Sequence, residues 1–147
     1  MTSKLEIACE LLYSALFFYY EGNSYYACLQ LAGGAEEILG AYVDCSGGLS
    51  DFKSSLNDTV KLSGCLDENG SQVNPSDITK LINLPKNSIK HMDDLTDSTV
   101  NFDAKAKAKE MLDRAVSNYY QLMTNYPLEE TALIKRFNAQ LVSVRVT

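Results

Sequence analysis

Apolar residues recur at intervals of three and four along much of this chain, and that period constrains its fold more than any other feature. Stripes of this kind run through residues 5–19, 25–43 and 104–123. Ser3 and Glu6 form a capping box before the first stripe. Because each stripe gives a helix one apolar face, the sequence predicts an all-α protein.

Weaker helices are predicted between these stripes. Residues 50–51 can cap one that runs to about Leu62, and residues 74–75 open the next. Proline lacks a backbone N–H group and clashes with the preceding turn. The helix that opens at residues 74–75 should therefore break or kink near Leu84 and restart with Pro85 in its first turn.

The last long helix begins after Asp103, which can cap it, and should lie centrally. Residues 128 to about 142 suggest a final amphipathic helix, followed by a strand-like tail at residues 142–146. A chain of 147 residues has room for one domain. We therefore expect a single domain over residues 1–147, an up-and-down bundle of four to five helices, with residues 126–147 as a C-terminal appendage.

Two features of the first two helices indicate close packing. Ile7, Leu11 and Phe18 form a second apolar line, about 100° to 200° around the first helix from its main stripe. Further helices of the bundle or a second subunit could cover this line, and we expect a homodimer. Small residues at 32–35 cost about 1 kcal/mol per glycine in a helix, so we expect another backbone to approach there.

Charge and composition exclude several classes of function. The formal net charge of -6 argues against broad adhesion to nucleic acid or anionic membranes, so any RNA contact must be local. The longest apolar run, residues 11–20, is shorter than the roughly 20 residues that span a bilayer. The four cysteines lack paired metal-site spacing, and Cys9 and Cys28 fall on apolar stripes. We expect a cytoplasmic protein without membrane contact, metal or cofactor.

The chain's one histidine lies in a segment that concentrates polar chemistry. If residues 86–91 are helical, Asn87, Lys90 and His91 share a face that Lys86 flanks. Imidazole titrates near neutral pH and ammonium groups offset phosphate charge, so this set could hold a phosphodiester and move a proton. In the alternative, both lysines are solvated and His91 caps a helix end or pairs with a neighbouring aspartate.

Glu36 and Glu37 are further candidates for binding, together with Lys90. Because they are adjacent on a helix, one carboxylate can face inward beside residues 32–35 while the other points elsewhere. An inward glutamate could pair with Lys86 or His91. In the alternative, both are solvated surface acids.

The segment Lys86-Asn87-Ser88-Ile89-Lys90-His91 resembles the motif of the HEPN family. In that motif an arginine precedes a polar residue, often asparagine, and a histidine follows a few positions later; lysine stands here in place of the arginine. Residues 5–20, 32–40 and 115–120 also resemble small bacterial HEPN-like proteins, so the resemblance covers about residues 4–125. It implies a four- or five-helix bundle.

For active family members, the resemblance implies metal-independent RNA cleavage in a cleft lined by two protomers. The histidine would handle protons and the arginine would steady the scissile phosphate. Lysine keeps the positive charge but lacks the planar fork that binds phosphate through two hydrogen bonds. We therefore expect a dimeric HEPN-like interaction protein of bacterial or phage defence or toxin–antitoxin type, with RNA cleavage weakened or absent.

Partners implied by this expectation are RNA and an antitoxin or nucleotidyltransferase. One alternative is an active metal-independent ribonuclease in which His91 is the general acid or base and Lys86 stabilises the phosphate. Another is a structural adaptor with no role in nucleic-acid binding.

Overall fold

The computed structural model describes the backbone of residues 1–146 and the side chains of residues 1–143. This part of the chain contains helices and turns but no strand, which confirms the all-α class for these residues. None of its helices is both long and apolar enough to cross a membrane. The α-helices are α1 (Lys4–Phe17), α2 (Tyr25–Cys45), α3 (Asp51–Leu66), α4 (Pro75–Ser88), α5 (Ala104–Leu122) and α6 (Ala132–Val146), with a π-helical turn η1 (Phe18–Gly22) and a 3-10 turn η2 (Leu95–Asp97).

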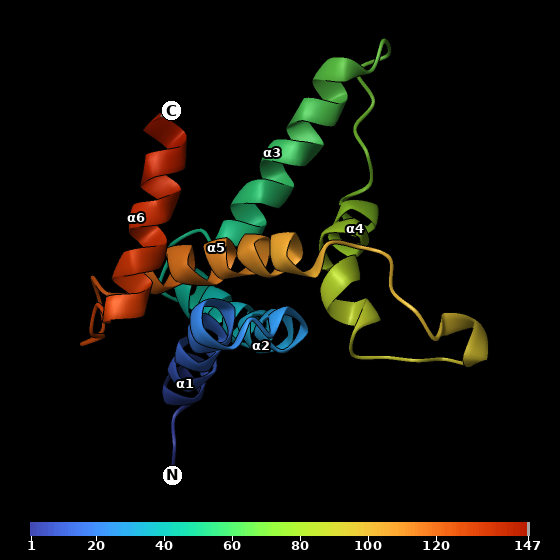
Figure 1. The fold of residues 1–147 in the computed structure, drawn as a ribbon. Helices are drawn as coiled ribbons and strands as arrows, with labels where there is room; N and C mark the ends of the chain where they lie inside the picture. Colours follow the sequence, from blue (N-terminus) through green and yellow to red (C-terminus); the bar gives the residue numbers. More distant parts are fainter. Residues whose placement is uncertain (147) are drawn as a thin grey trace.

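Helices α2 and α5 pack along each other at the centre of the structure, and α1 packs against α2 (Figure 1). The predicted stripes of these three helices provide most of the buried core, although members such as Leu5 and Tyr19 are only partly buried. The largest fully buried side chains from these helices are Leu12, Leu16, Leu29, Leu39, Val43, Leu112, Val116, Asn118, Tyr119 and Leu122. The helical period therefore located the core correctly.

Side-chain caps begin α1, α3, α4 and α5 where the sequence places them, whereas Ser24 at the start of α2 makes no side-chain cap hydrogen bond. Ser3 forms the predicted capping box with Glu6: the Glu6 amide donates to Ser3 Oγ at 3.1 Å, and the Ser3 amide donates to Glu6 Oε2 at 2.7 Å. Ser50, Asn74 and Asp103 cap α3, α4 and α5 through their side-chain oxygens. Each cap satisfies a backbone donor that has no partner within its helix.

The helix α6 packs its first turns against the core and differs from prediction at both ends, since it begins at Ala132 instead of residue 128. Ile134 and Phe137 are buried, and the Arg136 guanidinium lies over the Tyr20 ring at 3.9 Å from its centroid. The helix runs through Val146, so the strand-like tail predicted at residues 142–146 is wrong. A helix satisfies its own backbone groups, whereas a strand needs a neighbour and the described chain has none to offer.

Two other predicted boundaries also shift. The helix α4 runs without interruption to Ser88 with Pro85 inside it, so the predicted restart at Pro85 is wrong. Pro85 lies in the last turn, where its missing N–H group deprives only the carbonyl of Leu81, on a side of the helix that is open to solvent. The helix α3 extends past Gly64 to Leu66 instead of ending near Leu62.

Residues 51–88 form an arm of two helices, which we call the α3–α4 arm. Figure 1 shows α3 pointing away from the α2–α5 pair, and α4 contacts α3 and α2. The helix α3 buries none of its side chains, and α4 buries only Lys86. The arm consequently leaves several large apolar side chains in solvent: Leu62, Leu66, Val73, Leu81 and Leu84.

The small residues of α2 do pack closely, but against side chains. A Cβ atom on Gly33 would lie 2.6 Å from Cδ of Lys86, and one on Gly34 would lie 3.3 Å from Cδ1 of Leu11. We expected another backbone to approach residues 32–35. Instead, the aliphatic chain of Lys86 packs there on one side and Leu11 packs on the other. Because Gly33 has no side chain, the Lys86 chain can lie directly on α2.

The second apolar line of α1 divides between core and solvent. Leu11 and Phe18 are partly buried against the core of the same chain, whereas Ile7 is 42% exposed. Phe17 is also exposed and meets Phe18 edge to face. Of the two expected covers for this line, further helices of the bundle or a second subunit, neighbouring helices of the same chain provide part.

Candidate functional site

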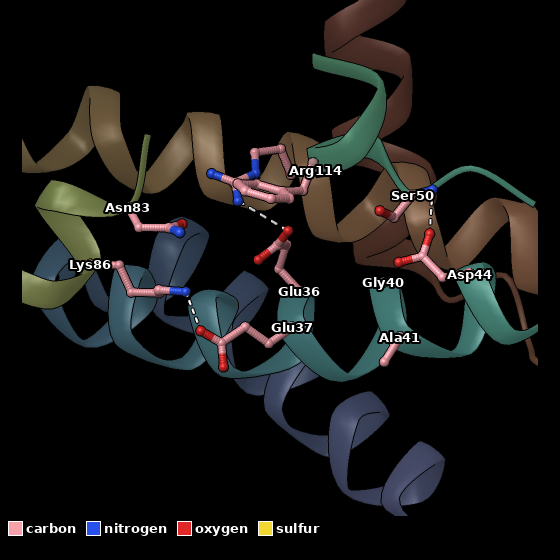
Figure 2. A pocket seen from close by; sticks show the side chains of 10 residues that line it. Glu36, Glu37, Gly40, Ala41, Asp44, Ser50, Asn83, Lys86 and Arg114 are labelled. Atoms are coloured by element: carbon pink, nitrogen blue, oxygen red, sulfur yellow. Dashed lines mark hydrogen bonds and ion pairs between the residues drawn. The ribbon is translucent and has the colours of Figure 1, made fainter. Parts of the chain in front are cut away.

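A cavity of about 220 Å³ lies where α2, α4, α5 and the start of α3 meet (Figure 2). It contains both predicted binding glutamates and one of the predicted catalytic residues, Lys86. Its lining side chains include Glu36, Glu37 and Asp44 from α2, Ser50 and Phe52 from the start of α3, Asn83 and Lys86 from α4, and Arg114 from α5. Polar groups from three helices therefore converge on one small space.

Glu36 and Arg114 form the deepest ion pair of the site. Arg114 Nη2 donates to Glu36 Oε1 at 3.0 Å, and both side chains are largely buried. The guanidinium also lies over the Phe52 ring, 5.4 Å from its centroid. This one arginine thus joins α5 to α2 and to the first turn of α3. Removing one partner of such a buried pair typically costs about 3–5 kcal/mol, because the other charge is left unpaired.

Lys86 forms the second ion pair of the site. The residue is 3% exposed, and its Nζ atom donates to Glu37 Oε1, as the dashed line in Figure 2 marks. Glu37 is the more exposed of the two adjacent glutamates and Glu36 is the buried one. The inward carboxylate therefore pairs with Arg114, and the outward carboxylate pairs with Lys86.

Asp44 organises the other end of the cavity. Its Oδ1 atom accepts a hydrogen bond from the Ser50 amide at 3.1 Å, and its Oδ2 atom lies 3.2 Å from the Lys53 ammonium. Burial alone would raise the pKa of the Asp44 carboxyl, but the Ser50 and Lys53 contacts outweigh it and the pKa is lowered. Asp44 therefore fixes the start of α3 as an ionised carboxylate.

Two buried polar atoms of the cavity lining make no hydrogen bond within the described part of the chain. They are Asn83 Oδ1 and Arg114 Nε. Buried polar atoms normally have partners, so both can bond a small polar molecule in the cavity. The nearby charges offset one another, since Glu36, Glu37 and Asp44 face Arg114, Lys86 and Lys53. The site is thus polar without a strong preference for anions.

The remaining predicted residues lie apart from this cavity. The helix α4 ends at Ser88, so Lys90 and His91 follow it outside the helix, and Asn87 is on its last turn. These three side chains are exposed, and none of them lines the cavity. The structure brings Lys86 together with Glu37 and places it in the same cavity as Glu36, but it does not bring His91 to that cavity. Among the described residues, no cluster of three or more His, Cys, Asp or Glu side chains is arranged for a metal ion.

Sequence reasoning missed Arg114 and Asn83. Arg114 and Asn118 lie four residues apart, on a polar line next to the buried stripe of α5. Glu36 and Asp44, two turns apart, lie in the same way beside the stripe of α2. These polar positions beside buried stripes could have marked Glu36 and Arg114 as candidates, although not their pairing. Asn83 carries no comparable signal.

Comparisons of the chain with protein-family models, curated proteins and solved structures found no significant match.

Proposed function

We propose that this protein is a dimeric, HEPN-like interaction protein in which RNA cleavage is weakened or absent. The observation that carries the proposal is the environment of Lys86. Its ammonium group is buried and neutralised by Glu37, and the exposed His91 does not line the same cavity. The defence or toxin–antitoxin role, with an antitoxin or nucleotidyltransferase as partner, rests only on the family resemblance of about residues 4–125 and its motif at residues 86–91.

RNA cleavage would require the lysine and the histidine to act on one phosphodiester. A general acid or base must come within hydrogen-bond reach of the proton it transfers, and the cation must contact the phosphate oxygens. To do so, Lys86 would have to leave both Gly33 and Glu37. That rearrangement exposes a packed aliphatic chain and separates an ion pair, which favours an interaction role over catalysis.

The α3–α4 arm supports the interaction role. Its exposed leucines are apolar surface that the rest of the described chain does not cover. Its solvent-accessible charged residues are mixed in sign, so a two-fold arrangement can set lysines of one arm against acids of the other. They are Asp51, Lys53, Asp58 and Lys61 on α3, Asp67 and Glu68 in the loop between the helices, and Asp77 and Lys80 on α4. A second copy of this chain is therefore the partner we assign to the arm.

The catalytic half of the proposal is tested with total RNA and no added metal. Wild type, His91→Ala and the control Lys80→Ala, which changes an exposed residue outside the 86–91 segment, are incubated at equal concentration, and their effect on cell growth is measured in parallel. We expect all three to leave the RNA intact and growth unchanged. Cleavage by wild type and Lys80→Ala but not by His91→Ala would identify an active ribonuclease and contradict the proposal.

A further inference from the structure

A larger groove, of about 770 Å³, runs along the first half of α1 on a part of the surface separate from the site above. Residues 127–129, between α5 and α6, form its opposite wall. Its apolar lining consists of Leu5, Cys9, Tyr13, Pro127 and Leu128. Sites for small molecules typically measure about 300–1,000 Å³ and are mainly apolar with a few placed polar groups. The groove has this size and this lining.

Hydrogen bonds hold the two walls of the groove in place. The hydroxyl groups of Tyr13 and Tyr119 lie 2.8 Å apart, and the Tyr119 hydroxyl donates to the backbone carbonyl of Glu129. Tyr119 is completely buried, and burial raises its pKa well above the ordinary value for a tyrosine. The hydroxyl therefore stays protonated and keeps residues 127–129 beside α1, so the groove is formed before any ligand binds.

The charges around the groove have one sign. Glu6, Glu10 and Glu129 line it, and no lysine or arginine does. Glu6 is engaged in the capping box with Ser3. Glu10 and Glu129 have exposed side chains, and neither forms an ion pair within the described residues. An apolar channel edged by two such carboxylates complements an apolar molecule that carries a positive charge.

We propose that this groove binds a hydrophobic primary amine of small-molecule size. The apolar body of the amine lies between Leu5, Tyr13 and Leu128, and its ammonium group meets Glu10 and Glu129. Cys9 contributes a neutral wall, because burial raises the pKa of its thiol. This site requires neither Lys86 nor His91, so it stands independently of the function proposed above.

The test uses three probes with the same eight-carbon chain at pH 7: octylammonium, octanol and octanoate. Binding is measured by calorimetry, and the site is located from amide shifts in α1 and residues 127–129. We expect octylammonium to bind there most tightly and octanoate least. The double variant Glu10→Gln/Glu129→Gln should weaken octylammonium binding by about fivefold to tenfold, as expected for two solvent-exposed charge contacts. The matched double variant Glu21→Gln/Glu68→Gln, which removes two exposed charges outside the groove lining, should leave binding unchanged.

Three results would overturn the proposal. The first is equal binding of all three probes, which would show an apolar groove without charge selection. The second is amide shifts that map away from α1. The third is binding of a twelve-residue leucine–lysine peptide at the groove without binding of octylammonium, which would make the ligand a protein segment instead of a small amine.

Discussion

Lys86 of α4 lies across Gly33 of α2 and ion-pairs with Glu37, one turn further along the same helix. The lysine is the one buried residue of α4, and α3 buries none. This contact is therefore a principal attachment of the α3–α4 arm to the core. It also explains why a cation expected to face a phosphate is instead neutralised inside the fold.

The two partners of this pair should differ in how well they tolerate substitution. Glu37→Gln leaves a buried ammonium without its counter-charge and should lower the free energy of unfolding by about 1–2 kcal/mol, less than for a fully buried pair because Glu37 is 58% exposed. Lys86→Met keeps the packing on Gly33 and removes the charge, so it should change the free energy of unfolding by less than about 1 kcal/mol. Urea denaturation measures both, and a larger loss for Lys86→Met would contradict this assignment.

Adjacent glycines of α2 should also respond differently to alanine. Both substitutions gain about 1 kcal/mol of helix propensity. In Gly33→Ala, however, the new methyl group would lie 2.6 Å from Lys86 Cδ and must displace the lysine, whereas in Gly34→Ala it meets Leu11 at 3.3 Å. Thermal or urea unfolding should find Gly33→Ala less stable than Gly34→Ala by at least about 1 kcal/mol. Equal stabilities would mean that the lysine chain does not rest on Gly33.

Stability should fall at alkaline pH because of the buried thiol of Cys28. Burial raises the pKa of this thiol from 9.0 to about 12. The folded state therefore keeps the proton that the unfolded state loses, so this contribution is fully present below about pH 9 and is lost as pH rises through about 12. At 1.36 kcal/mol per pKa unit its upper bound is roughly 4 kcal/mol.

The measurement is the free energy of unfolding between pH 8 and 12 under reducing conditions. Cys28→Ala should show a shallower decline than wild type. Cys45→Ala, which removes an exposed thiol, should follow the wild-type curve. The idea fails if the two variants have the same dependence on pH.

Local signals in the sequence predicted most of the helical fold. Caps such as Ser3 and Asp103 and the apolar stripes act within one helix, so their spacing suffices to place helix starts and the core. The tail at residues 142–146 was misassigned because alternating valines favour a strand only where another strand is available. Pro85 was misread because the one carbonyl that loses its hydrogen bond, that of Leu81, lies on an exposed part of the helix, where water can replace the missing donor.

The candidate site was predictable only in part because it depends on how helices pack. Adjacent glutamates on α2 indicated that one would face inward, and Glu36 does. Its partner Arg114 is 78 residues away, and no local pattern specifies that pairing. The expected face of residues 86–91 required α4 to continue to His91, but the helix ends at Ser88. Because α4 ends at Ser88, the exposed His91 is separated from the buried Lys86.

The most direct test of the proposed function is the molecular mass in solution, measured by sedimentation equilibrium for wild type, Leu81→Asp and Ile7→Asp. Leu81 and Ile7 are both exposed in the single chain, so each variant should fold. Circular dichroism can verify this. We predict twice the monomer mass for wild type and Ile7→Asp, and the monomer mass for Leu81→Asp. A monomeric wild type, or a dimer that Ile7→Asp breaks and Leu81→Asp leaves intact, would contradict the assignment of the α3–α4 arm as the contact between two copies.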